Sequence, residues 1–234
     1  MTWYANVIYT TPAREVVESV RAYPALASRL YVVTDFKGIR SEWTRAQFAD
    51  DGEIRHSLPP GGLLAIWPPA HMSQPGPTPD AELLEQPAYA DNHPDSIDRD
   101  PATKWVDAGF TGTDTYGAFG SHSAEVRWPA ELFETLAGMA DDLGVPFAYY
   151  YCATWGGRAE AEVSWLFERG RRRLWFHDRT EGECMCREDS RQHVVPREVL
   201  QEALGGLALA LPTGFFAPHE RSFDWARYWL RTSR

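Results

Sequence analysis

A Gly-Gly pair between two alternating runs is the feature that most constrains how this chain folds. In AYYYCATWGGRAEAEVSWLF, residues 148–167, a run rich in aromatic residues precedes Gly156-Gly157, and a run in which apolar and polar residues alternate follows it. Two glycines between such runs are typical of a two-residue β-hairpin, because that turn requires positive φ angles. Arg169-Gly170 supplies a second turn signal. We therefore predict a three-stranded antiparallel meander over residues 147–178.

The first hairpin also predicts which side chains share a face of the sheet. Pairing Trp155 with Arg158 places Tyr150 opposite Val163. The predicted core face then consists of Ala148, Tyr150, Cys152, Ala161, Val163, Trp165, Leu174 and Phe176. The opposite face carries Tyr149, Tyr151, Glu160, Glu162, Ser164, Arg173, Trp175, His177 and Arg179, and Glu168 lies opposite Arg171.

This second, mixed face has three possible interpretations. Opposite charges meet on it, such as Glu162 and His177, and such cross-strand pairs stabilise a sheet by roughly a few tenths of a kcal/mol each. The rings of Tyr149, Tyr151 and Trp175 match the composition of a protein-binding surface. They are also compatible with packing under a loop or helix, and catalysis is the third interpretation. Tyr149, Tyr151, Glu162, Trp175 and His177 are therefore candidate partner-binding residues.

Residues 68 to about 116 differ in character from the rest of the chain. They begin with closely spaced prolines and hold nine carboxylates against two basic residues, which gives −7 of the formal net charge of −10. A loop of this length inside a compact domain is functional or mobile. We predict an acidic recognition arm that includes Asp95, Asp98 and Asp100, with a solvated insertion as the alternative.

Cap and breaker signals predict helices around the sheet. Pro12 opens the first, Pro129 the second, and Ser222 caps the last; a further helix covers residues 196–204. Together with the meander, these elements predict one α+β domain over residues 1–234. It has a twisted, mainly antiparallel sheet, helices packed mostly on one face, and a long Pro/Asp-rich loop at about 68–116. Further strand candidates are residues 5–11, 29–35 and 61–69.

Net charge and cysteine content narrow the class of protein. A charge of −10 argues against nucleic-acid binding, because neutralising phosphates requires a surplus of Lys and Arg, and it suits a basic protein partner. Three cysteines do not make a disulfide framework, and the N-terminus has no signal-peptide pattern. We expect a cytoplasmic protein with no membrane segment and no cofactor; the sequence leaves its oligomeric state open.

The usual enzyme signatures are missing from the sequence. It has no G-x-S-x-G, no G-x-x-x-x-G-K-[ST] and no H-E-x-x-H, which disfavours an enzyme without excluding one. The alternative function is therefore an enzyme or small-molecule binder. Its site would use Tyr149, Glu162 and His177, where the carboxylate would stabilise a charged imidazole.

His177, Cys184, Cys186 and His193 form the pattern H-x6-C-x-C-x6-H. Two thiolates and two imidazoles are a ligand set for tetrahedral zinc. Structural zinc sites usually hold their cysteines in a tight turn, whereas C-x-C on a strand directs both side chains to one face without such a turn. We predict two reduced, partly buried cysteines, and zinc binding is the alternative.

One resemblance to a known family rests on the hairpin. The aromatic strand, the Gly-Gly turn and the strand ending in Trp, AYYYCATWGGRAEAEVSW, resemble stretches in bacterial immunity proteins that neutralise polymorphic or contact-delivered toxins. The resemblance covers about residues 146–178. It implies an acidic, cytoplasmic α+β protein without chemistry of its own that covers the active site of a cognate toxin. We therefore expect an inhibitor of a basic toxin, such as a nuclease.

Overall fold

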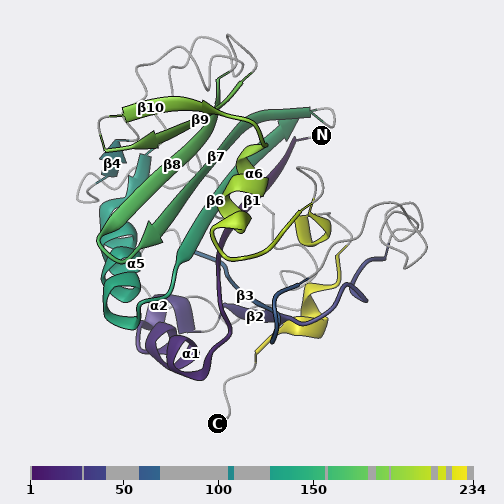
Figure 1. Cartoon of the computed structure of the whole chain (residues 1–234). Helices are drawn as coiled ribbons and strands as arrows, with labels where there is room; N and C mark the ends of the chain where they lie inside the picture. Colours follow the sequence, from purple (N-terminus) through teal and green to yellow (C-terminus); the bar gives the residue numbers. More distant parts are fainter. Residues whose placement is uncertain are drawn as a thin grey trace.

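The computed structural model describes residues 2–27, 29–40, 58–68, 105–107, 127–155, 158–178, 183–189, 191–211, 216–219 and 223–230. Eight strands form one antiparallel sheet in the order β10-β9-β8-β7-β6-β1-β3-β2 (Figure 1). They are β1 (Thr2–Thr10), β2 (Leu30–Val33), β3 (Leu63–Ile66), β6 (Phe147–Trp155), β7 (Arg158–Glu168), β8 (Arg171–Asp178), β9 (Glu183–Glu188) and β10 (Arg191–Val195). A separate pair consists of β4 (Trp105–Asp107) and β5 (Arg127–Pro129). The predicted α+β class and mainly antiparallel sheet are confirmed.

The N-terminal strand lies inside the sheet rather than at its edge. Ile8 of β1 pairs with Ile66 of β3 on one side and with Tyr149 of β6 on the other. At the outer edge of β2, the Leu230 N–H donates to the Leu30 carbonyl at 2.8 Å, next to an antiparallel bridge between Tyr31 and Trp229. Residues near the C-terminal end of the described chain therefore close this edge of the sheet.

Helices cover both faces of the sheet. One face, called here the α5 face, packs against α1 (Arg14–Arg21), α2 (Pro24–Ala27) and α5 (Ala130–Leu143). The other, called the α6 face, packs against α6 (Val199–Gly205) and the 3-10 turns η2 (Ala217–His219) and η3 (Trp225–Tyr228). In Figure 1, α6 lies in front of the strands that it covers. Of the α-helices that the structure describes, α1, α2 and α5 pack on the α5 face and α6 packs on the α6 face.

A β-bulge overturns the predicted register of the first hairpin. Trp155 does pair with Arg158, but the register shifts between Ala153 and Thr154. Beyond the shift, Tyr150 lies opposite Ser164 instead of Val163. Glu160 is the additional residue on β7, and one extra residue moves the following side chains to the other face. The second hairpin follows the prediction: Val163 pairs with Phe176, Trp165 with Leu174, and Glu168 with Arg171.

Several predicted boundaries also change. The first helix begins at Arg14 rather than at Pro12, with Ala13 as its N-cap residue. The last predicted helix is only the 3-10 turn η3. Strand β4 lies within residues 68–116, and the rest of that segment after Pro68 lies outside the described residues. Among the helices that the structure describes, none combines the length and apolar composition needed to cross a membrane.

Candidate functional site

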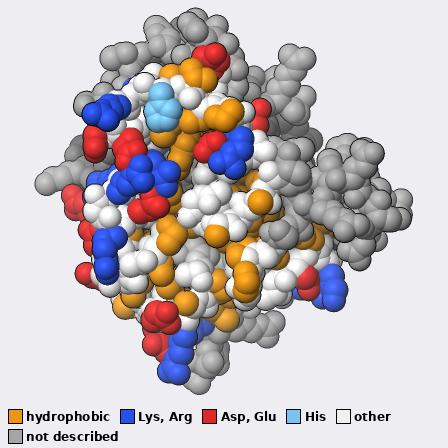
Figure 2. Space-filling model, in the orientation of Figure 1, with side chains coloured by type: hydrophobic (Ala, Val, Ile, Leu, Met, Phe, Trp, Pro, Cys, Tyr) orange, Lys and Arg blue, Asp and Glu red, His pale blue; other side chains and the backbone are white. Residues whose placement is uncertain are grey.

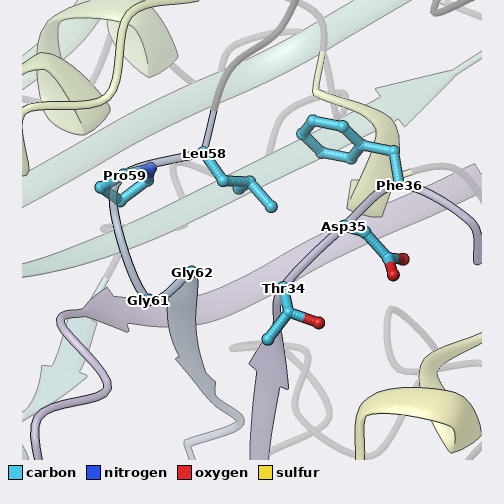
Figure 3. Close-up of a pocket in the computed structure, with 7 residues that line it drawn as sticks. All are labelled: Thr34, Asp35, Phe36, Leu58, Pro59, Gly61 and Gly62. Atoms are coloured by element: carbon cyan, nitrogen blue, oxygen red, sulfur yellow. The ribbon is translucent and has the colours of Figure 1, made fainter.

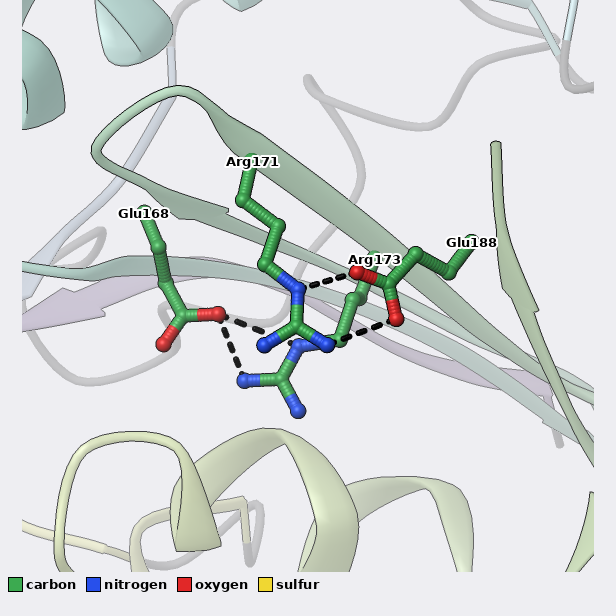
Figure 4. A network of polar contacts seen from close by, with 4 residues as sticks. All are labelled: Glu168, Arg171, Arg173 and Glu188. Atoms are coloured by element: carbon green, nitrogen blue, oxygen red, sulfur yellow. Dashed lines mark hydrogen bonds and ion pairs between the residues drawn. The ribbon is translucent and has the colours of Figure 1, made fainter.

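Four charged side chains form a corner on the α6 face, at the ends of β7, β8 and β9 (Figure 4). Arg173 donates from Nε (3.1 Å) and Nη2 (2.6 Å) to Oε2 of Glu168. Arg171 holds both carboxylate oxygens of Glu188, with Nη2 at 2.7 Å from Oε2. We call these four residues the Arg–Glu corner. Paired guanidinium and carboxylate groups fix each other's geometry, so the corner presents an ordered polar surface.

The surroundings of this corner are mixed in charge. The Arg173 guanidinium lies 5.1 Å from the centroid of the Trp175 ring, which it helps to cover. Figure 2 shows basic and acidic side chains interspersed over the part of the α6 face that β8, β9 and β10 form. Exposed ion pairs of this kind contribute little to stability.

A second set of functional groups lies buried on the same face. The hydroxyl of Tyr9 is 2.7 Å from Nε2 of His219, whose ring stacks on Tyr150 at a centroid distance of 4.8 Å. The Tyr150 hydroxyl donates to Oε1 of Glu162 at 2.8 Å. Cys152 is the neighbour of Glu162 across β6 and β7. We call Tyr9, Tyr150, Cys152, Glu162 and His219 the buried polar cluster.

Burial controls the protonation of this cluster. It raises the pKa of Glu162 to about 7, although the hydrogen bond from Tyr150 opposes the shift. It lowers the pKa of His219 to about 3. It also raises the pKa of the Cys152 thiol, and the nearby Glu162 carboxylate adds to that shift. At neutral pH the imidazole and the thiol are therefore uncharged, and Glu162 lies close to its midpoint.

The imidazole of His219 is expected to stay neutral from pH 8 down to pH 4, because its pKa of about 3 lies below that range. Carbon and nitrogen chemical shifts of the ring, followed by NMR across this range, measure the protonation directly. A midpoint for His219 near pH 6 would contradict the buried hydrogen bond with Tyr9.

The structure separates the residues that the sequence grouped into one mixed face. Tyr149 and Tyr151 belong to the core on the α5 face, whereas Glu162 and Trp175 lie on the α6 face. The exposed fractions are 2% for Tyr149, 2% for Tyr151 and 1% for Trp175. The three rings therefore do not form an exposed recognition face, and the packing interpretation holds for them. The bulge in β7 is the physical reason, since it reverses the faces beyond Ala153.

The alternative site at Tyr149, Glu162 and His177 is also not assembled. Tyr149 packs its ring against Phe133 of α5 at a centroid distance of 5.6 Å, on the face opposite to Glu162. The backbone of His177 lies in β8, but its side chain lies outside the described residues. A phenol and a carboxylate on opposite faces of a sheet cannot act on one substrate.

The cysteines of the predicted zinc alternative are free and buried. Cys184 pairs with His177 and Cys186 with His193, so the four backbone positions share the α6 face. Burial raises the pKa of Cys184 to about 12 and also raises that of Cys186. No group of three possible ligands is arranged around a metal position among the described side chains. Both cysteines are free and lie deeper than the partly buried positions that the sequence predicted.

A pocket of about 530 Å³ lies where β2 ends and β3 begins (Figure 3). Figure 3 shows Phe36 and Leu58 along it, with the carboxylate of Asp35 directed away from Leu58. That carboxylate accepts hydrogen bonds from the Tyr228 hydroxyl at 2.6 Å and from the Lys37 N–H at 2.9 Å. The Asp35 carboxylate is therefore engaged in hydrogen bonds that stabilise the fold. The lining residues are Thr34, Asp35, Phe36, Leu58, Pro59, Gly61 and Gly62.

Some residues of the site have no local signal in the sequence. Tyr9 and His219 are separated by 210 positions, so only the packing of η2 against β1 and β6 brings them together. The pair Arg171–Glu188 depends on β8 and β9 being neighbours. Asp95, Asp98 and Asp100 lie outside the described residues, so their role stays a prediction.

Comparisons with known proteins add no residue assignment to this site. Neither protein-family models, nor curated proteins, nor solved structures gave a match to the chain. The charge, burial and geometry of the chain itself are therefore the basis for its proposed function.

Proposed function

We propose that this chain is an immunity-type inhibitor, which binds a cognate basic bacterial toxin in the cytoplasm and covers its active site. The observation that carries the proposal is the distribution of charge. Residues 68–116 supply −7 of the net charge of −10. A concentrated negative field accelerates association with a basic partner and disfavours nucleic acid as a ligand.

Strands of the folded domain flank this acidic segment. Strand β3 leads into it, and β4, near its other end, pairs with β5. Both β4 and β5 contact α5, which packs on the sheet. The ends of the described chain that flank the acidic segment therefore belong to the packed domain, and a local concentration of negative charge favours steering of a basic partner.

The contents of the core favour binding over catalysis. A nucleophilic cysteine requires a lowered thiol pKa, but burial raises the pKa of Cys152, Cys184 and Cys186. A general base works best with a pKa near the ambient pH, and that of His219 is about 3. Glu162 has a suitable pKa, but its carboxylate is buried and bonded to Tyr150. These buried groups are therefore suited to stabilising the folded structure rather than to catalysis.

Because Tyr149, Tyr151 and Trp175 are core residues, they are no longer candidates for the binding surface. We assign recognition instead to the acidic segment, with Asp95, Asp98 and Asp100, and to ordered polar surfaces such as the Arg–Glu corner. Arginine is enriched at protein interfaces, and pre-ordered side chains lose less entropy on binding.

The first experiment is capture of a partner from the native organism on the tagged full chain, with elution by increasing salt and mass spectrometry. The expected result is a stoichiometric basic protein that elutes at high salt, because screening weakens the attraction. A captured protein that is acidic, or a small molecule in its place, would contradict the proposal. The eluted partner is then available for the kinetic comparison below.

Reversing the charge at Asp95, Asp98 and Asp100 to lysine is expected to slow association with the captured partner roughly tenfold or more at low salt, since steering depends on opposite charge. The matched control reverses Glu134, Asp142 and Glu183, which are exposed and described in the structure. Both variants change the net charge equally. Stopped-flow association rates at several salt concentrations separate a local effect from a global one, and equal rates for the two variants would remove the segment from the proposal.

A further inference from the structure

The two edges of the large sheet differ. The β2 edge is closed by Trp229 and Leu230, as described above. At the other edge, no described strand pairs with the outer side of β10. Arg191 to Val194 are exposed, and Val194, at 51%, is the most exposed large hydrophobic residue of the described chain. An exposed edge strand offers backbone donors and acceptors to another strand.

The hairpin that precedes this edge determines which backbone groups it presents. Glu188 and Arg191 close a two-residue turn, in which Asp189 has φ 51°. In an antiparallel ladder the closing pair of such a hairpin is hydrogen-bonded, and the pattern then alternates along the strand. The backbone groups of Arg191, His193 and Val195 therefore turn toward β9. Those of Gln192 and Val194 turn toward the open edge.

This pattern matches a second copy of itself. When two β10 strands run antiparallel about a two-fold axis at His193, Gln192 of one copy lies opposite Val194 of the other. Both positions present their backbone groups outward, so each such pair forms two hydrogen bonds. Arg191 then lies opposite Val195, and no two like charges face each other. Only His193 lies opposite the same residue, the His193 of the second copy.

We propose that two copies of this chain associate by antiparallel pairing of their β10 strands about a two-fold axis at His193. The contact joins two eight-stranded sheets into one continuous sheet. It is a self-complementary interface of the kind that two-fold symmetry requires. Five residues from each copy make a small interface, so the dimer is weak and forms at high chain concentration. The inference concerns oligomeric state and does not depend on the proposed inhibitor function.

A charge-swap experiment on the full chain tests the axis directly. In His193→Lys and His193→Glu, each variant places like charges opposite each other, so each alone is expected to dimerise at least roughly fivefold more weakly than the original chain. An equimolar mixture of the two places the new lysine of one copy opposite the new glutamate of the other and is expected to recover association. Sedimentation equilibrium at millimolar chain concentration measures all four samples, and circular dichroism checks that each variant is folded.

Val194→Pro provides a second, independent test. Proline removes one outward N–H from each strand, so association is expected to weaken roughly tenfold or more. Proline is tolerated in edge strands, so the monomer is expected to stay folded. Val194→Thr keeps the N–H and is the matched control. The proposal is overturned if the original chain is monomeric at millimolar concentration. It is equally overturned if both charged variants dimerise as well as the original, because another surface would then mediate association.

Discussion

Replacing Trp175 with alanine is expected to lower the free energy of unfolding by about 3–5 kcal/mol, the usual cost of truncating a buried large ring. The ring is 1% exposed and belongs to the core between the sheet and α6. Its loss leaves a cavity beneath the Arg173 guanidinium. Chemical denaturation followed by circular dichroism measures the change.

The control for this prediction is Val194→Ala, measured at low chain concentration. Val194 is exposed, so its truncation is expected to change stability by about 0.5 kcal/mol or less. If the Trp175 variant were as stable as the control, the ring would have to lie on the surface. The interpretation of Trp175 as a partner-binding residue would then return.

Glu162→Gln is expected to stabilise the protein above pH 7 by about 3 kcal/mol and to have little effect below pH 4.5. The carboxyl group titrates at about pH 7 in the fold and near 4.5 when unfolded. Between these values the native state retains a proton that the unfolded state has released, so stability falls as pH rises and then levels off. Glutamine keeps an acceptor for the Tyr150 hydroxyl and removes the ionisation.

The difference between variant and original chain isolates the contribution of Glu162. His219 acts in the opposite direction, because its folded pKa of about 3 lies below the unfolded value of 6.5 and its stabilisation is lost as pH falls through this window. This contribution is common to both proteins and cancels in the difference. Glu134→Gln, at an exposed position, is the matched control for replacing a carboxylate by an amide. A constant difference from pH 4 to pH 8 for Glu162→Gln would contradict the buried environment.

The meander illustrates how far the sequence predicts the fold. Turn chemistry is local, so Arg169-Gly170 predicts the second hairpin and its pairs correctly, such as Val163 with Phe176. The bulge in β7 has no comparable signal, because Glu160 fits an alternating pattern as well as its neighbours do. Without this extra residue, the predicted register placed Tyr149 and Glu162 on the same face of the sheet. With it, the two residues lie on opposite faces.

The position of β1 and the buried polar cluster depend on long-range packing. Strand propensity predicts that residues near Val7 are extended, but not that they pair with β3 and β6. His219 likewise lies in a short turn, and only tertiary structure places it against Tyr9 and Tyr150. Charge composition, in contrast, requires no fold, so the acidic segment at 68–116 follows from the sequence alone.

The central proposal is inhibition of a basic toxin, and neutralisation in cells tests it most directly. The captured partner is expressed from an inducible promoter, with and without this chain, and growth is followed together with the activity of the purified partner. The expected result is growth arrest by the partner alone, rescue by co-expression, and loss of partner activity at a one-to-one ratio. Continued arrest in the presence of folded inhibitor, or a partner that remains active in the complex, would contradict it.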